Sequence, residues 1–340
     1  MARPRVTVLG SLNTDISVPV PHLPGPGETV LAAAAASIGT GGKGANQAVA
    51  AARLGASTRM VGCCGDDEFG GSLRAALVAE GIDVTGLRSV PGATSGLALI
   101  TVDPAGENVI AVAPGANGLA GEEEVAAAFS APCDVLVLSA EIPVAVLAAA
   151  LRRANAGGWK GGEGRVRTVL NLAPVPEGAG RLLAGQPDWL VVNAHEAGIL
   201  LGAAAADAAQ AQAMAVRLAA GETGPGAGAA PLADPGSAAG PGGRHAVITL
   251  GGAGAVLAGP AVAAAIDGFR VPAVDTVGAG DAFVGALAVA LASGLDPAEA
   301  VRAACAAGAT ATTRRGAQDG LPRPASVLAA TGFRWPEIPD

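Results

Sequence analysis

The feature that most limits how this 340-residue chain can fold is a repeated alternation of short apolar runs with longer helical patterns. The runs are rich in Val, Ile and Leu, which is typical of strands buried on both faces. We expect strands at 6–10, 58–62, 135–138, 166–172, 189–192 and 246–250, and helices at 45–54, 67–80, 144–154, 203–220 and 297–312. Alternation of this kind predicts an α/β fold with a doubly wound, mainly parallel sheet flanked by helices.

Two segments fall outside this alternation. Residues 18–20 and 29–31 read as extended but are separated by a Pro/Gly-rich stretch, and prolines exclude a central strand. Residues 97–102 and 108–112 flank an Asp-Pro-Ala-Gly turn sequence, which predicts a hairpin. We expect segments at about 13–38 and 95–112 to form a small β-sheet lid over the ligand site, within a single domain spanning residues 1–340.

Composition excludes several classes of protein. The chain is 51% hydrophobic but only 2% aromatic, and its net charge is −8. A nucleic-acid partner is not expected, because that would require a basic stripe with aromatic stacking partners. No run of about 18 unbroken apolar residues predicts a membrane span. The four cysteines form no Cys-x-x-Cys pair, which suits reduced thiols in a cytoplasmic protein. Residues 221–243 form a Gly/Pro-rich low-complexity insertion.

Polar residues follow several predicted strands at their carboxyl ends, where ligands bind in open α/β sheets. These residues are Asn13, Glu141, Asn193 and Thr249, and Asp281 lies at the start of a following helix. Asn13 and Asp15 are two apart, so in an extended segment both face one way and could hold vicinal hydroxyl groups. An Asx turn leaving the strand is the alternative interpretation.

Two glycine-rich segments come directly before helical patterns. In Asp275-Thr276-Val277-Gly278-Ala279-Gly280-Asp281, the glycines let the free N–H groups of a helix start approach an anion. A carboxylate beside such donors suits phosphoryl transfer, in which it takes a proton from the attacking hydroxyl. The alternative is that Asp281 only caps the helix. In the other segment, residues 39–47, Lys43 lies among glycines without Walker-loop spacing, which favours a ligand-binding role.

These segments carry a family resemblance. Gly41-Gly42-Lys43-Gly44-Ala45-Asn46-Gln47 and the segment from Asp275 to Asp281 resemble the two signatures of the ribokinase-like sugar kinases, the phosphofructokinase-B family. Asn193-x-x-Glu196 and the segments 249–254 and 313–318 match further parts of the family pattern in the same order. The resemblance covers nearly the whole chain. Its first motif is more similar to ribokinases than to fructokinases or adenosine kinases.

The resemblance implies ATP-dependent phosphorylation of D-ribose at the 5-hydroxyl, giving ribose 5-phosphate and ADP. Asp281 would be the general base, beside an anion hole formed by the N–H groups of Gly278, Ala279 and Gly280. The sugar would contact Asp281 together with Asn13, Asp15, Gly41, Gly42, Lys43, Gly44, Ala45, Asn46 and Glu141. ATP would contact Asn193, Thr249, Leu250, Gly251, Gly252, Ala253, Gly254, Gly280 and Cys305.

The resemblance also implies two metal ions and a homodimer formed through the lid sheet. Glu196 would hold Mg²⁺ through water, and an activating K⁺ would be bound by Asp275, Val277, Ala311, Arg314, Gly316 and Gly320. Two positions depart from the family: Gly320 replaces the usual Ser, and Cys305 lies near a position that is often Asn. A kinase for another sugar or a nucleoside remains an alternative. A non-catalytic sugar-binding module is disfavoured because Asp281 and its glycines are intact.

Overall fold

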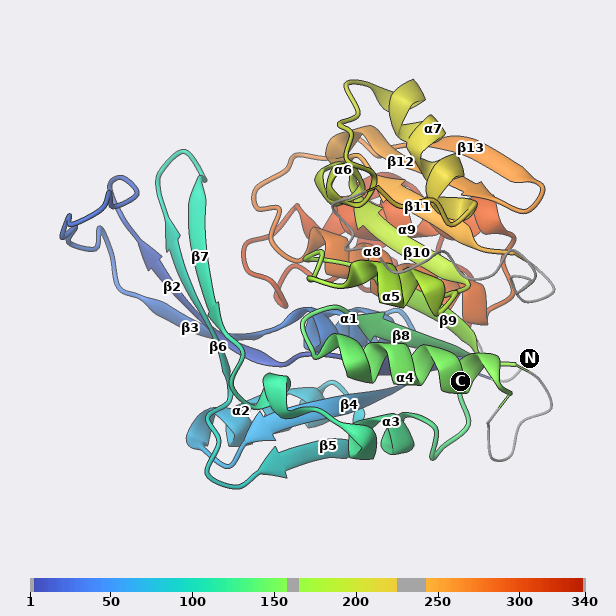
Figure 1. Cartoon of the computed structure of the whole chain (residues 1–340). Helices are drawn as coiled ribbons and strands as arrows, with labels where there is room; N and C mark the ends of the chain where they lie inside the picture. The colour runs from blue at the N-terminus through green and yellow to red at the C-terminus, as the bar shows by residue number, and fades with distance from the viewer. Residues whose placement is uncertain (1–2, 158–164, 225–242, 339–340) are drawn as a thin grey trace.

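The computed structural model describes residues 3–157, 165–224 and 243–338. Its main element is a nine-stranded sheet in the order β13-β12-β11-β10-β9-β8-β1-β4-β5 (Figure 1). The strands are β1 (Arg5–Leu9), β4 (Ser57–Gly65), β5 (Asp83–Val90), β8 (Val135–Ser139), β9 (Arg167–Asn171), β10 (Trp189–Asn193), β11 (His245–Thr249), β12 (Gly254–Gly259) and β13 (Val262–Asp267). In this sheet only the pairings made by β12 are antiparallel, so the predicted mainly parallel sheet is confirmed.

Helices cover both faces of this sheet. One layer contains α1 (Lys43–Arg53), α2 (Glu68–Ala79), α8 (Ala279–Ala292), α9 (Pro297–Ala311) and α10 (Pro324–Thr331). The other contains α3 (Glu122–Ala128), α4 (Val144–Asn155), α5 (Ala179–Ala184), α6 (Ala194–Leu201) and α7 (Ala208–Ala219). Successive strand residues enter opposite cores, as Val137 and Leu138 do, which explains the continuous apolar runs.

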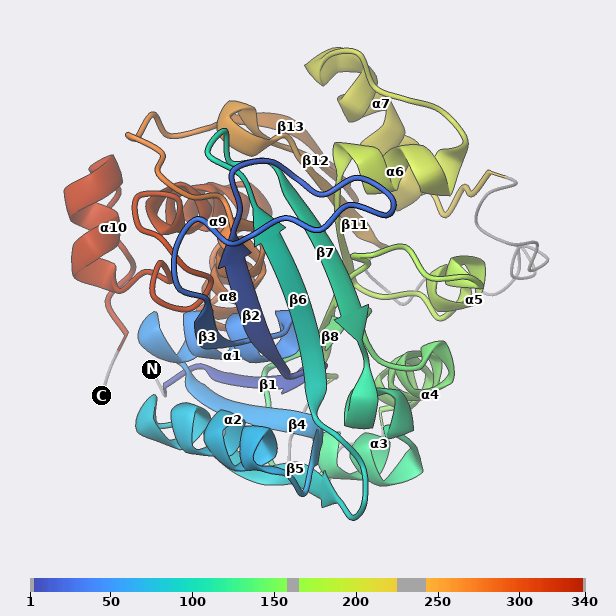
Figure 2. The same ribbon diagram turned by 90° about the vertical axis from the view of Figure 1, so that its left-hand side faces the viewer.

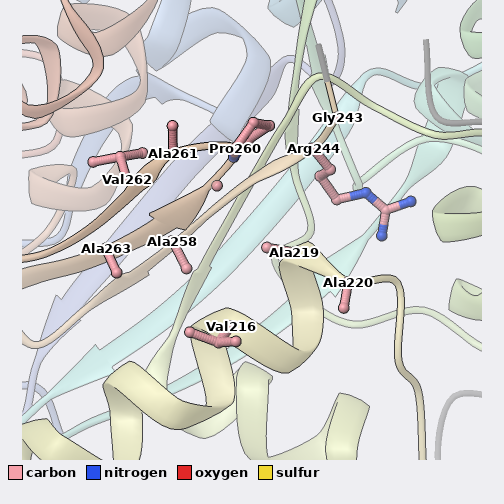
Figure 3. A pocket seen from close by; sticks show the side chains of 11 residues that line it. Val216, Ala219, Ala220, Gly243, Arg244, Ala258, Pro260, Ala261, Val262 and Ala263 are labelled. Carbon is pink, nitrogen blue, oxygen red and sulfur yellow. The ribbon is translucent and has the colours of Figure 1, made fainter. Parts of the chain in front are cut away.

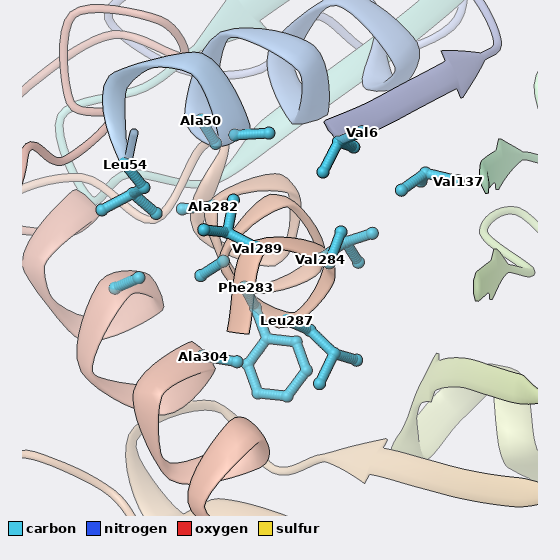
Figure 4. Packing of buried hydrophobic residues seen from close by; sticks show 14 of the residues in the cluster. Val6, Ala50, Leu54, Val137, Ala282, Phe283, Val284, Leu287, Val289 and Ala304 are labelled. Atoms are coloured by element: carbon cyan, nitrogen blue, oxygen red, sulfur yellow. The ribbon is translucent and has the colours of Figure 1, made fainter. Parts of the chain in front are cut away.

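Helices α1, α8 and α9 pack closely, and the first two carry the candidate site (Figure 4). Their contacts are made by small side chains around larger ones such as Phe283 and Leu287. At Gly285, a Cβ atom would lie 2.7 Å from both the Gln47 carbonyl oxygen and the Ala50 Cβ. The close approach of α1 and α8 therefore requires glycine at this position.

A second sheet of four strands stands beside the main body, in the order β3-β2-β6-β7 (Figure 2). Its strands are β2 (Asn13–Pro19), β3 (Ser37–Gly41), β6 (Gly96–Val102) and β7 (Asn108–Ala113). The predicted hairpin is formed by β6 and β7, and the Asp103 side chain accepts hydrogen bonds from the N–H groups of Ala105 and Glu107 in its turn. We call this four-stranded element the small sheet.

The helix predicted over residues 203–220 is wrong in its first part. Helix α6 ends at Gly202, which adopts a left-handed conformation with φ of 66°. Helix α7 begins only after Asp207, whose side chain accepts a hydrogen bond from the N–H of Gln210. The pattern also missed β5, β13, α3, α5, α6 and α10. Most of the predicted insertion, residues 225–242, lies outside the described residues.

The described part of the chain contains no helix with the length and apolar character needed to cross a membrane.

Candidate active site

Asp281 lies in the first turn of α8 and is only 7% exposed. Two amide groups from the first turn of α1 hold its carboxylate. Asn46 Nδ2 donates to Asp281 Oδ2 at 2.9 Å, and Gln47 Nε2 donates to Oδ1 at 3.0 Å. The starts of two helices therefore meet at this carboxylate, where N–H groups lack intrahelical acceptors.

The predicted anion-hole residues surround the same helix start. Gly278 has a φ of 78°, and a Cβ atom there would lie 2.7 Å from the Ala317 carbonyl oxygen. A Cβ atom at Gly280 would meet no atom within 4 Å, so open space adjoins this residue. The Ala279 N–H donates to the Thr276 carbonyl oxygen at 3.2 Å. A phosphoryl group at this helix start would compete with that single weak bond.

Glu141 follows strand β8 and contacts the other glycine-rich helix start. Its Oε2 accepts hydrogen bonds from Ser11 Oγ at 2.6 Å and from the Lys43 N–H at 3.1 Å. Lys43 is the first residue of α1, and its ammonium group lies in a negative environment. The carboxylate of Asp281 is the main cause that raises the pKa of Lys43, with smaller contributions from Glu141 and Glu196. Lys43 is therefore charged at neutral pH.

Asn13 and Asp15 lie on one face of β2, next to two glycines that leave room for them. A Cβ atom at Gly41 would lie 2.1 Å from an Asp15 carboxylate oxygen. Gly42 has a φ of 88°, and its Cβ would lie 2.6 Å from the Asn13 nitrogen. Burial, and then the carboxylates of Glu141 and Asp281, raise the pKa of Asp15 to about 6. The structure thus brings together the predicted sugar-binding residues of β2, α1, Glu141 and α8.

The predicted nucleotide-binding residues lie at the ends of two neighbouring strands. Asn193 of β10 pairs in register with Thr249 of β11. Asn193 also caps α6: its Oδ1 accepts from the Glu196 N–H at 2.8 Å, and Glu196 Oε2 accepts from the Asn193 N–H at 2.7 Å. Burial raises the pKa of Glu196, against this hydrogen bond and the charge of Lys43. Residues 250–254 form the turn into β12, whereas Cys305 is buried within α9.

The predicted cation-binding residues converge where two loops meet. Asp275 Oδ1 accepts from the Val277 N–H at 3.0 Å, and Oδ2 accepts from the Gly316 N–H at 2.9 Å. A Cβ atom at Gly320 would lie 2.7, 3.1 and 3.5 Å from the carbonyl oxygens of Ala311, Gly316 and Arg314. Three of the predicted carbonyl ligands therefore lie close to Gly320, and the Gly316 oxygen accepts from the Gly320 N–H at 3.2 Å.

Several supporting residues were not predicted. Gln47 belongs to the first motif but had no assigned role, and its Nε2 also donates to Asn171 Oδ1 at 2.9 Å. Asn171 is the last residue of β9, whereas the predicted strand ran on to residue 172. With the strand end placed correctly, the search for polar residues at strand ends that identified Asn13 would have identified Asn171 as well. Asn117, which hydrogen-bonds Asn13 Oδ1 at 2.8 Å, follows no predicted strand and had no local signal.

A separate, mostly apolar pocket lies between α7 and the β12–β13 hairpin (Figure 3). Arg244 is the charged residue among those that line it. The guanidinium group points away from the other labelled side chains and donates to the carbonyl oxygens of Leu183 and Leu218. Burial lowers the pKa of Arg244 to about 10. No predicted site residue lines this pocket, so we do not assign the phosphoryl-transfer chemistry to it.

Comparisons with known proteins identify the family to which the chain belongs. The family model for "pfkB family carbohydrate kinase" matches residues 3–224 and 228–324. The chain is 36% identical to the ribokinase of Haemophilus influenzae over 322 residues, which is 94% of this chain and 96% of the relative. It is 31% identical to the deoxyribokinase of Salmonella typhi over 319 residues, which is 93% of this chain and 95% of that protein.

Among solved structures, the chain is similar to ribokinase from Arabidopsis thaliana complexed with ribose and ATP. The TM-score is 0.75 at 28% identity, covering 97% of this chain and 98% of the other. The chain therefore belongs to the pfkB family and is an ATP-dependent carbohydrate kinase.

Proposed function

We propose that this kinase transfers the γ-phosphoryl group of ATP to the 5-hydroxyl of D-ribose. The observation that carries the proposal is the buried Asp281 carboxylate, held by Asn46 and Gln47 at the start of α8. The similarity to a ribokinase of 36% identity supports ribose as the sugar. So does the fold shared with a ribokinase complexed with ribose and ATP.

Asp281 accepts the proton of the sugar hydroxyl as that oxygen attacks phosphorus. The N–H groups at the start of α8, from Gly278 to Gly280, stabilise the negative charge on the transferring group. Lys43 adds a positive charge close to Asp281, which its raised pKa supports. The two amide donors of Asn46 and Gln47 hold the Asp281 carboxylate in a fixed position for this step.

The sugar hydroxyls bind to polar groups that surround Asp281. Asp15 and Glu141 supply carboxylate acceptors, and Asn13 and Asn46 supply amides. Asn46 Oδ1 is buried without a hydrogen-bond partner, so it offers an acceptor to a hydroxyl donor. The carboxylates of Asp15, Glu141 and Asp281 lie close enough to affect one another, so this end of the site would repel an anion and favours a polyol.

Protein groups at this site could supply only part of the coordination of Mg²⁺. Within the described residues, no three His, Cys, Asp or Glu side chains form a metal-binding cluster. Glu196 would hold the ion through water, since one of its oxygens accepts from the Asn193 N–H. When bound, Mg²⁺ would neutralise phosphate charge. The rest of its coordination would come from water and the nucleotide.

K⁺ would be bound near Gly320. The carbonyl oxygens of Ala311, Arg314 and Gly316 lie close to this residue, and oxygen ligands suit a hard cation. Asp275 joins the two loops by accepting N–H bonds from each. We infer that K⁺ activates the enzyme by stabilising this pair of loops next to the start of α8.

We also propose that the small sheet closes over the sugar and pairs two subunits. Several apolar side chains on it are exposed to solvent, including Ile38 at 67%, Leu99 at 49% and Val109 at 54%. An apolar surface of this kind is typical of a subunit interface. Strand β2 connects that surface to the site, because Asn13 and Asp15 lie on it.

The test is ADP release from MgATP with ribose, deoxyribose, fructose, adenosine or no sugar, in K⁺ and again in Na⁺. We expect turnover to be highest with ribose and higher in K⁺ than in Na⁺. A preference for deoxyribose would favour the second candidate, which the 31% identity to a deoxyribokinase supports. Ribose turnover that does not respond to K⁺ would contradict the proposed cation site but not the proposed kinase activity. No turnover with any sugar, while ribose still raises the unfolding temperature, would contradict the proposal.

A further inference from the structure

The buried side chain of Asn117 has a hydrogen-bond pattern that constrains the proposed sugar site. Asn117 lies in the 3-10 turn η1 (Gly115–Leu119) after the small sheet and is 1% exposed. Its Oδ1 accepts from the Leu12 N–H at 2.9 Å, and its Nδ2 donates to the Leu12 carbonyl oxygen at 2.9 Å. A backbone N–H can only donate and a carbonyl can only accept. These two bonds therefore fix which end of the Asn117 amide is oxygen.

A third hydrogen bond fixes the orientation of the Asn13 amide in turn. Asn117 Nδ2 also donates to Asn13 Oδ1 at 2.8 Å. Because Oδ1 of Asn13 is held as an acceptor, its NH₂ group is the end that remains for a ligand. Asp15, two residues further along β2, faces the same side and only accepts when ionised. The NH₂ group of Asn13 thus offers a donor and the Asp15 carboxylate an acceptor, and one hydroxyl group can bond to both.

The backbone of β6 leaves room for the bond between the two amides. Gly96 pairs in register with Asn13. A Cβ atom at Gly96 would lie 2.2 Å from both Asn117 Nδ2 and Asn13 Oδ1. Any other residue at position 96 would push the two amides apart. The requirement for glycine here is therefore explained by this hydrogen bond rather than by a turn.

We propose that Asn117 is a positioning residue that fixes the hydrogen-bond polarity of Asn13 and so selects a sugar with a hydroxyl group beside Asp15. This inference rests on the proposed sugar site. Asn117 acts on the sugar through Asn13 rather than by direct contact. Its loss should therefore weaken sugar binding more than the chemistry or ATP binding.

The first variant is Asn117→Asp, which keeps the shape but cannot donate when ionised. We expect its KM for ribose to rise about tenfold, as the loss of a buried hydrogen bond to a polar group implies. Its kcat at saturating ribose and its KM for ATP should stay within about twofold of the native values. Asn155→Asp is the matched control. Asn155 is exposed and also donates to a backbone carbonyl, that of Gly185, at 2.7 Å, so both KM values should be unchanged.

The second variant is Asn13→Asp, which still accepts from Asn117 but replaces the donor that faces the sugar with an acceptor. We expect a rise of about tenfold or more in the KM for ribose, with a native unfolding temperature. If Asn117→Asp does not fold, this variant decides the question.

Three outcomes would overturn the inference: a native KM for ribose in Asn13→Asp, a native KM for ribose in folded Asn117→Asp, or equal rises in both KM values in Asn117→Asp. The failure of this inference can be told apart from the failure of the proposed function. If the native enzyme does not turn over ribose, the proposed function is wrong. If the native enzyme is active and both variants keep its KM for ribose, only the role of Asn117 is wrong.

Discussion

At the scale of single residues, the environment of Asp281 separates its chemical role from a role in binding. Asp281→Asn preserves the shape of a side chain that is enclosed by two amide donors but removes its ability to take a proton. We expect kcat to fall by about 10²–10⁴-fold, the usual contribution of a general base. Sugar affinity, measured by calorimetry, should change far less. Turnover close to that of the native enzyme would show that Asp281 only links α8 to α1 through Asn46 and Gln47.

Asp15 should make sugar use depend on pH. Its pKa of about 6 means that the carboxylate, which we propose accepts hydrogen bonds from sugar hydroxyl groups, is ionised above that pH and neutral below it. The value of kcat/KM for ribose, measured at saturating ATP, should therefore fall as pH drops through about 6, because this ratio reports the state of the enzyme before ribose binds. Asp15→Asn should have a low ratio without this decline. An unchanged profile in that variant would assign the titration to another group.

Residues of the site could be predicted from the sequence when they combine a chemical type with a local position. Asp281 and Lys43 lie at glycine-rich helix starts, and Asn13 and Asn193 lie at strand ends, so each carries a signal in its neighbours. Asn117 does not, because its partners Leu12 and Asn13 are more than a hundred positions away. A supporting side chain of this kind can be recognised only once the chain is folded.

At the scale of elements, the crossing of α1 and α8 should be sensitive to a single methyl group. Gly285→Ala would place Cβ 2.7 Å from the Gln47 carbonyl oxygen, so the helices must separate. We expect a loss of about 1–3 kcal/mol in the free energy of unfolding in urea, together with lower turnover as Gln47 moves from Asp281. Gly71→Ala in α2 is the control, since a Cβ atom there would meet no atom within 4 Å and stability should be kept or rise. Equal midpoints for both variants would contradict this.

Elements were predictable where burial imposes a simple pattern. The runs at 135–138 and 189–192 are apolar throughout because each strand contacts both cores, and this also indicated a parallel sheet. The helix break at residues 202–207 was not predictable from alanine-rich periodicity. Alanine suits a helix on every face, so only Gly202 and the Asp207 cap marked the boundary.

At the scale of the whole molecule, the exposed apolar face of the small sheet should determine the oligomeric state. We expect the native 32.5 kDa chain to sediment as a dimer and Leu99→Lys to sediment as a monomer, because a buried lysine would lack a partner. Val78→Lys on α2 is the control, since Val78 is similarly exposed at 55% but lies on a helix of the main body. A native monomer, or a dimer that survives Leu99→Lys, would contradict the proposed interface.

The bond between Asn46 and Asp281 joins residues that are 235 positions apart in the chain. During synthesis, the first helix of the site leaves the ribosome long before the carboxylate that it must hold. A nascent chain, or one released early by a stop codon, therefore contains the proposed sugar-binding residues of β2 and α1 without the proposed proton acceptor. Such products should therefore be unable to consume ATP.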